Sequence, residues 1–173
     1  MGLEIVSIKS SFPLKSENLN FNNYKKIIKA TGIDKRYISS EKENVINLSI
    51  NSAKKILNNK IKNQISFLLF VSQTSPFKFP SVSCILQHEL KLPKDIYAVD
   101  INMGCSGYIY ALKLASSLEN LYNKRKYGLI ICSDTYTKYI KKNNKSCRPI
   151  FSDASTTTLL KISKRNQFQS FDF

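Results

Sequence analysis

The sequence predicts an α/β fold in which strands and helices alternate along the chain. Three short apolar runs carry this prediction: residues 66–72 (SFLLFVS), 96–102 (IYAVDIN) and 126–134 (KYGLIICSD). Short continuous apolar runs are typical of strands that are covered on both faces of a sheet. Because segments with helical apolar spacing separate these runs, we expect a mixed, mostly buried sheet with helices on both faces.

The N-terminal third is expected to contain one strand and one helix. Residues 3–8 (LEIVSI) combine alternation with β-branched side chains, as a strand does. Gly32 suits a tight turn before the segment KRYIS. In 44–58 the apolar residues follow helical spacing, which predicts a helix: Val45, Leu48, Ala53, Ile56 and Leu57.

The middle of the chain is expected to contain two buried strands joined by a helix. The run at 66–72 is the candidate for a central strand, and the prolines of 73–80 indicate a loop. Residues 81–91 are predicted to form a helix with Ser81 as its cap. The second apolar run is then another buried strand, which ends at Gly104.

The last third begins with a helix and ends in two strands. From Ser106 the apolar period becomes helical over much of the circumference, so we expect a buried helix: Ile109, Ala111, Leu112, Leu114, Ala115, Leu118 and Leu121. The third apolar run is a further covered strand. Residues 135–149 are polar and irregular, and 156–163 (TTTLLKIS) have strand composition.

The charge balance is strongly basic, with 27 Lys and Arg against 12 Asp and Glu and a formal net charge of +15. Such an excess attracts polyanions in general. Most of the basic residues are lysines scattered among Asn and Ile, and a bias of composition explains that pattern equally well. No clustered Arg and aromatic face and no nucleic-acid motif is present, so we do not expect nucleic-acid binding.

The four cysteines form neither a C-x-x-C motif nor a pair with histidine, so we expect no structural metal and no cofactor. No apolar stretch approaches the length of a membrane span, and no secretory leader pattern precedes the first strand. We therefore expect a single cytoplasmic domain of 173 residues with reduced thiols and no membrane partner.

The segment Met103-Gly104-Cys105-Ser106-Gly107 joins a predicted strand to a predicted helix. A cysteine at this place feels the positive end of the helix dipole, which favours the reactive thiolate. Backbone N–H groups at the same turn can stabilise the oxyanion of a thioester under attack. The flanking glycines keep side chains away from an incoming substrate. Cys105 is therefore the candidate nucleophile.

Other candidate residues have simpler interpretations. Cys84 and Cys132 lie in apolar patterns and are expected to be small buried side chains. The single histidine, His88, lies in QHELK, a helical stretch that is expected to face solvent.

Four segments together resemble the ketoacyl-ACP synthase III family of thiolase-fold condensing enzymes. AVDINMGCSGYIYAL resembles the family's nucleophile motif, and three further stretches occur in the family's order: 31–39 (TGIDKRYIS), 74–90 (TSPFKFPSVSCILQHEL) and 132–160 (CSDTYTKYI followed by IFSDASTTTLL). The resemblance covers nearly the whole chain. It implies that residues 1–173 form one N-terminal half of the thiolase-like fold.

The resemblance also implies a chemistry. Cys105 would accept an acyl group as a thioester and pass it to a carbanion formed by decarboxylation of malonyl-ACP, in a decarboxylative Claisen condensation. The implied partners are an acyl thioester, acyl-carrier protein and a second copy of the chain. Phe79 matches the residue that crosses the family's dimer interface to line the partner's acyl pocket, although an apolar anchor before Pro80 is an equal alternative.

Some features depart from the family. Its His and Asn for decarboxylation lie in a second half, whereas this sequence ends at Phe173 with NQFQSFDF, which resembles the lead into the connecting loop. A fragment, or a truncated or split gene, would explain this ending. Lys26 or a neighbour stands where the family often has a Trp that stacks on coenzyme A, and 151–155 (FSDAS) has fewer glycines than the family's turn. The competing hypothesis is a non-catalytic half-domain that dimerises or binds acyl-carrier protein.

Overall fold

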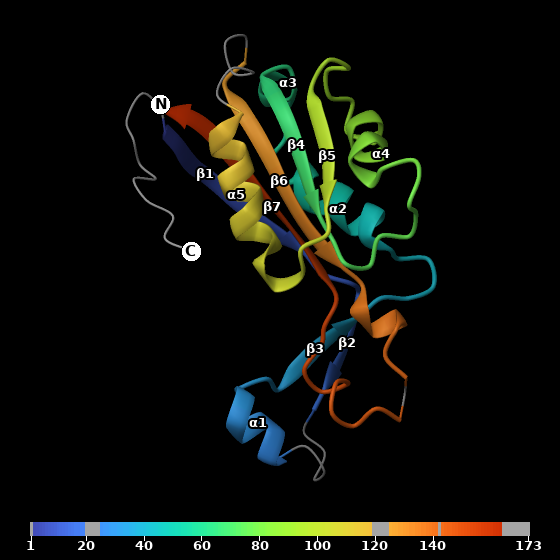
Figure 1. Cartoon of the computed structure of the whole chain (residues 1–173). Coiled ribbons are helices and arrows are strands. Elements are labelled where there is room, and N and C mark those ends of the chain that lie inside the picture. The colour runs from blue at the N-terminus through green and yellow to red at the C-terminus, as the bar shows by residue number, and fades with distance from the viewer. Residues whose placement is uncertain (1, 20–24, 119–124, 142, 164–173) are drawn as a thin grey trace.

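The computed structural model describes residues 2–19, 25–118, 125–141 and 143–163. A five-stranded mixed sheet forms the central layer, with helices packed against both of its faces (Figure 1). A smaller lobe with a two-stranded sheet extends from one end of this layer. The predicted fold class is thus confirmed.

The strand order in the main sheet is β1-β7-β6-β4-β5. The central strands β4 and β6 pair in parallel, and β5 pairs in parallel with β4. The long strand β7 pairs antiparallel with both β6 and β1. The bounds are β1 Gly2–Ser11, β4 Ile65–Val71, β5 Tyr97–Ile101, β6 Tyr127–Asp134 and β7 Ala154–Ser163.

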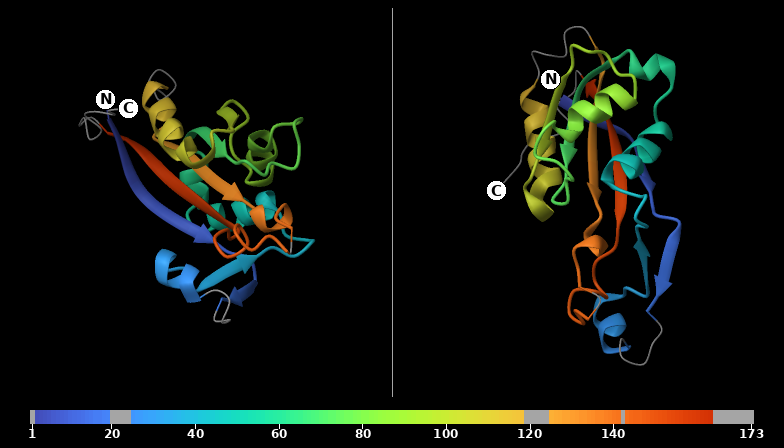
Figure 2. Two further views of the ribbon diagram at one scale, coloured as in Figure 1. Left: turned by 60° about the horizontal axis from the view of Figure 1, so that its bottom comes forward. Right: turned by 90° about the vertical axis from the view of Figure 1, so that its right-hand side faces the viewer.

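Two hydrophobic cores lie on opposite faces of the sheet. Helices α2 (Val45–Lys54) and α4 (Val82–Glu89) cover one face, with the short α3 (Asn59–Lys62) beside Gln64 at the start of β4. Helix α5 (Gly107–Ser117) covers the other face (Figure 2). Every residue of β4 is buried because it receives helices on both sides, as predicted for a central strand.

Helix α4 begins at the predicted place, but its cap is not the predicted one. Ser81 occupies the N-cap position without accepting a hydrogen bond through its side chain. Its hydroxyl instead donates to Sγ of Cys84. The carboxylate of Asp100, near the end of β5, accepts the N–H groups of Val82 and Ser83 at 2.8 Å each. A carboxylate suits this place because a helix N-terminus is electropositive.

The predicted burial is wrong for one strand and one helix. The predicted buried strand at 96–102 is β5, which lies at the edge of the sheet and leaves Tyr97 and Asp100 exposed. Helix α5 buries only one face, and Ile109 and Tyr110 on its outer side are each 44% exposed. A continuous apolar pattern cannot distinguish an element that is buried on all sides from one that has an exposed side. Leu121 lies outside the described residues.

The smaller lobe contains β2 (Lys15–Asn18), β3 (Lys35–Ile38) and α1 (Lys25–Thr31). Gly32 makes the expected tight turn, with a φ of 71°. The buried guanidinium of Arg36 donates to Glu17 at 2.6 and 2.9 Å and to the carbonyl oxygen of Arg148 at 2.8 Å. Arg148 also reaches Glu17, at 3.1 Å. This ion-pair network holds the lobe together and was not predicted.

Candidate active site at the ends of the parallel strands

Three parallel strands end at the same edge of the sheet and carry the candidate site. Ser72 follows β4, Asn102 follows β5, and Asp134 is the last residue of β6. In open α/β sheets, ligands bind where the carboxyl ends of neighbouring strands meet. The strand pairing therefore brings Cys105 together with residues that are far from it in sequence.

The nucleophile turn lies between β5 and α5. A short 3₁₀ helix, η2 (Gly104–Ser106), continues directly into α5, so Cys105 lies just before the first α-helical turn. Gly104 has a φ of 57°, which only glycine adopts without strain. The Ser106 hydroxyl donates to the carbonyl oxygen of Met103 at 2.9 Å. The turn is fixed, and Cys105 is exposed to solvent.

Close packing places this turn against the sheet. A Cβ atom on Gly107 would lie 2.5 Å from Cγ1 of Val71, the last residue of β4. Only a glycine allows the first turn of α5 to approach the strand this closely. The helix N-terminus and Cys105 are therefore held at the carboxyl edge of the sheet.

Asp134 organises the loop that follows β4. Its Oδ1 atom accepts hydrogen bonds from the N–H groups of Gln73 and Thr74, at 2.8 and 2.9 Å. The hydroxyls of Thr74 and Ser72 donate to the same oxygen, at 2.8 and 3.2 Å. The N–H of Thr135 returns to the Thr74 hydroxyl at 2.8 Å. Four donors on one oxygen fix this loop beside the nucleophile turn.

A second set of contacts joins the nucleophile turn to the 3₁₀ helix η4 (Tyr136–Lys138). The hydroxyl of Tyr136 donates to Oε1 of Gln73. The amide nitrogen of Gln73 faces Gly104, where an added Cβ would lie 3.0 Å away. The Tyr136 ring packs on Phe151 at a centroid distance of 4.9 Å. Partial burial, followed by the charges of Asp134 and Cys105, raises the pKa of Tyr136, so this phenol is neutral at physiological pH.

The turn at 151–155 has a structural role in this chain. Asp153 is fully buried and accepts hydrogen bonds from the N–H groups of Ser39 and Thr137, at 2.8 and 2.9 Å. The Thr137 hydroxyl also donates to Asp153, at 2.5 Å. These bonds join the turn to the smaller lobe and to η4 despite the lower glycine content.

Phe79 lies on the loop between β4 and α4 and is 90% exposed. A cavity of about 370 Å³ opens at the base of the same loop, between the ends of β4 and β5. Its lining includes Gln73, Phe77, Lys78 and Asn102 but not Phe79. Within one chain, therefore, Phe79 is largely exposed to solvent and does not line this cavity.

The remaining cysteines differ in exposure. Cys84 is exposed, which contradicts its predicted burial, because it lies on the outer face of α4. Cys132 is largely buried, and this burial, together with the charge of Asp134, raises its pKa to about 12. Cys147 is half-buried. Among the described residues, no group of three or more His, Cys, Asp or Glu side chains is arranged to hold a metal ion.

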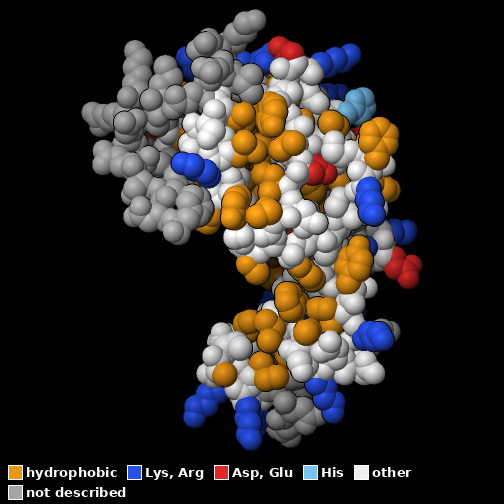
Figure 3. Space-filling view, viewed as in Figure 1, with side chains coloured by type: hydrophobic (Ala, Val, Ile, Leu, Met, Phe, Trp, Pro, Cys, Tyr) orange, Lys and Arg blue, Asp and Glu red, His pale blue; other side chains and the backbone are white. Residues whose placement is uncertain are grey.

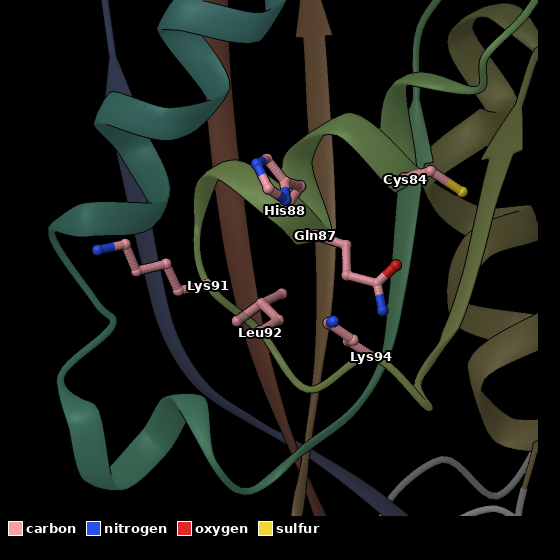
Figure 4. A pocket seen from close by; sticks show the side chains of 6 residues that line it. All are labelled: Cys84, Gln87, His88, Lys91, Leu92 and Lys94. Atoms are coloured by element: carbon pink, nitrogen blue, oxygen red, sulfur yellow. The ribbon is translucent and has the colours of Figure 1, made fainter.

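A separate cavity of about 400 Å³ lies against α4 and the loop that follows it (Figure 4). Cys84, Gln87, His88, Lys91, Leu92 and Lys94 line it. Cys84 and Lys91 point in opposite directions rather than toward a common point. His88 is exposed, as expected. This shallow basic cavity does not include Cys105.

The sequence predicted Cys105 as the nucleophile but did not single out Asp134, Gln73 or Tyr136, which the structure places beside it. Asp134 carried a weak signal, because a carboxylate that ends a buried strand often faces a site at the carboxyl edge of the sheet. Tyr136 lies in the segment CSDTYTKYI that resembles the family, but no sequence pattern connects it with Gln73, from which 63 residues separate it.

Comparisons with known proteins point to one group. A family model described as 3-oxoacyl-[acyl-carrier-protein (ACP)] synthase III matches residues 99–173. A beta-ketoacyl-[acyl-carrier-protein] synthase III from Blochmanniella floridana is 34% identical over 143 residues, which are 80% of this chain and 43% of that protein. One from Clostridium perfringens is 36% identical over 132 residues, which are 75% of this chain and 40% of that protein.

Solved structures give the same result. A 3-oxoacyl-(acyl-carrier protein) synthase from Burkholderia xenovorans LB400 superposes with a TM-score of 0.86 at 30% identity, over 96% of this chain and 50% of that one. A priming beta-ketosynthase of a polyketide pathway shares the fold, with a TM-score of 0.84 at 18% identity. The chain spans about two fifths of the length of the curated relatives it matches.

Proposed function

Since this chain belongs to the 3-oxoacyl-[acyl-carrier-protein] synthase III family, of whose fold it forms the N-terminal half, we propose that Cys105 accepts an acyl group as a thioester. The single observation that carries this proposal is the exposed Cys105 on a glycine-flanked turn that runs directly into α5. Backbone dipoles at a helix N-terminus favour a thiolate, and the thiolate is the nucleophile.

The proposed first step is acyl transfer. The Cys105 thiolate attacks the carbonyl carbon of an acyl thioester, and the tetrahedral intermediate collapses with loss of the carrier thiolate, which takes up a proton. One thioester bond forms as another breaks, so no oxidant or cofactor is needed. Cys105 is exposed to solvent, so its sulfur is accessible to the carbonyl group of an acyl thioester.

The proposed second step belongs to the whole condensing enzyme. Decarboxylation of malonyl-ACP releases carbon dioxide and gives a carbanion. The carbanion attacks the acyl carbon on Cys105, forms the new carbon–carbon bond and releases the Cys105 thiolate. Acyl-carrier protein is thus a proposed partner, and the names of the relatives support this choice.

We also propose that two copies of the chain associate through the edge strand β5 and the loop that carries Phe79. An edge strand offers unpaired backbone groups to a second strand. Apolar side chains gather on the face that carries α5 and near the junction with the smaller lobe (Figure 3). A stable two-fold dimer would bury at least about 1,000 Å² and bring Phe79 of one copy near Cys105 of the other.

We propose that the protein is located in the cytoplasm. Within the described residues, none of the helices has the length and apolar character needed to cross a bilayer. The four cysteines are free thiols, which fits a reducing compartment. The cytoplasm is therefore the proposed location.

The acyl-transfer proposal is tested by intact-mass spectrometry of the chain after incubation with acyl-ACP or acyl-coenzyme A. We expect the mass to rise by one acyl group in the wild type and not in Cys105→Ala. Equal acylation of both proteins would overturn the assignment. If neither donor acylates a folded wild-type chain, the half-domain that only binds a partner becomes the better description.

The dimer is tested separately, by sedimentation at micromolar concentration. We expect a dimer for the wild type and a shift toward monomer for Phe79→Asp. A monomer whose sedimentation is unchanged by the substitution would refute the interface. Lys78→Asp is a matched control, because it changes charge at the neighbouring position of the same loop.

A further inference from the structure

The hydrogen-bonded side chains of Gln73 and Tyr136 lie beside the nucleophile turn. Gln73 comes from the loop after β4, and Tyr136 comes from η4, after β6. Their hydrogen bond therefore bridges the ends of two parallel strands. Both strand ends are already fixed by Asp134, so the pair is held in place from both sides.

The hydrogen bond determines how the Gln73 amide is turned. Tyr136 donates its only hydroxyl hydrogen to Oε1 of Gln73. The NH₂ group, on the other side of the same carboxamide, therefore points away from Tyr136. This group lies against Gly104, the residue immediately before Cys105. A side chain at position 104 would collide with it, since an added Cβ lies 3.0 Å from Nε2.

Tyr136 is itself oriented by packing and by the backbone. Its ring rests on Phe151, and the N–H of the next residue, Thr137, is bound by the buried Asp153. The charge of Cys105 is one of the causes that raise the pKa of Tyr136, after partial burial and the charge of Asp134. Tyr136 stays neutral near pH 7 and so remains a hydrogen-bond donor.

We propose that Gln73, oriented by Tyr136, is a positioning residue for the nucleophile: it packs on Gly104, fixes the turn and keeps a neutral N–H donor next to Cys105. A fixed donor beside a developing anion stabilises it without reorganisation. This inference deepens the proposed function, on which its catalytic meaning rests. The inference predicts the reactivity of the Cys105 thiol, which can be measured without any acyl substrate.

The test is the rate of Cys105 alkylation by iodoacetamide as a function of pH, followed by peptide mass spectrometry. Tyr136→Phe removes the hydroxyl and keeps the ring on Phe151, and Gln73→Leu removes the amide from an exposed side chain. Each variant is expected to slow alkylation at neutral pH by about threefold to tenfold, the range for loss of one net hydrogen bond. Tyr139→Phe, an exposed tyrosine three residues away, serves as the control.

A second readout separates positioning from general damage. Gln73→Glu keeps an acceptor for Tyr136 but replaces the NH₂ group with a negatively charged oxygen. It is expected to move the pH of half-maximal alkylation upward by more than Gln73→Leu does, because a like charge disfavours a thiolate. Circular dichroism checks that each variant is folded. Should Tyr136→Phe fail to fold, the two Gln73 variants still decide the question.

Wild-type alkylation rates with an unchanged pH profile in Gln73→Leu and Gln73→Glu would overturn the inference. Normal acylation of Cys105 alongside unchanged alkylation would leave the proposed function intact and remove only this inference. The predicted slowing of alkylation, together with absence of acyl transfer in the wild type, would leave the positioning role and remove the proposed function.

Discussion

Gly107 packs so closely on Val71 that a single added carbon would lie 2.5 Å from the valine Cγ1. This contact joins the first residue of α5 to the last residue of β4. It determines how near the helix N-terminus and Cys105 come to the carboxyl edge of the sheet. The candidate site therefore depends on a close approach between two residues that take no part in chemistry.

Gly107→Ala is expected to displace the nucleophile turn. The added methyl group must push the start of α5 away from β4, and overpacking of this kind costs about 1–3 kcal/mol. We expect a lower midpoint of thermal unfolding and slower alkylation of Cys105. The double variant Gly107→Ala with Val71→Ala provides the matched control, because it removes Cγ1. If the double variant is no better than the single one, the contact is not the cause.

Gly128→Ala is expected to be the more damaging glycine substitution for stability. A Cβ on Gly128 in β6 would lie 1.9 Å from Cζ of Phe67 in β4, in the buried centre of the sheet. We expect a loss of at least about 2 kcal/mol of unfolding free energy, measured by urea titration. Combining it with Phe67→Leu should recover part of this loss. Wild-type stability in Gly128→Ala alone would contradict the packing described here.

The thiols are expected to differ in how their reactivity depends on pH. Burial and the charge of Asp134 raise the pKa of Cys132 to about 12, so this residue remains a thiol throughout the physiological range. We expect Cys132 to be the slowest of the four in alkylation between pH 7 and about 9. Cys105 should react faster than Cys84, which is also exposed to solvent but lies within the helix α4. Faster labelling of Cys84 would argue against an activated Cys105.

The Glu17 network should make the smaller lobe sensitive to acid. Burial alone would raise the pKa of Glu17, but its hydrogen bonds and charge contacts with Arg36 and Arg148 outweigh this and lower the pKa. A group whose folded pKa is lowered contributes stability above its ordinary pKa and loses it as the pH falls through the folded value. Glu17→Gln should therefore lower the unfolding midpoint at pH 7, with a difference that fades below about pH 4. An equal difference at pH 7 and pH 3 would exclude this explanation. Glu4→Gln, on β1, controls for the loss of one charge.

Much of the fold followed from local patterns. The apolar run predicted as a buried strand at 66–72 is β4 (Ile65–Val71), which is fully buried, and the glycine-flanked Cys105 lies at a strand-to-helix turn, as expected. Such features depend on neighbours in sequence, which periodicity and turn chemistry describe well. What the sequence missed depends on contacts between distant segments. Asp100 replaces Ser81 as the cap of α4 only because β5 ends beside that helix.

The sequence pattern also failed to predict which side chains are exposed to solvent. Periodicity marks which side chains are apolar, but strand order decides which strand lies at an edge, and β5 does. Cys84 faces solvent although its neighbours Val82 and Leu86 are buried, because α4 presents only one side to the core. The contact between Gln73 and Tyr136 likewise appears only once β4 and β6 are paired.

The most direct test of the account is the chemical site of acylation. A variant that keeps Cys105 but carries Cys84→Ser, Cys132→Ala and Cys147→Ser would be incubated with an acyl thioester, quenched in acid and mapped by peptide mass spectrometry. The account predicts one acyl group on the peptide that contains Cys105, which neutral hydroxylamine removes because the bond is a thioester. An acyl group on any other residue, or a folded chain that stays unacylated at Cys105 with both acyl-ACP and acyl-coenzyme A, would contradict it.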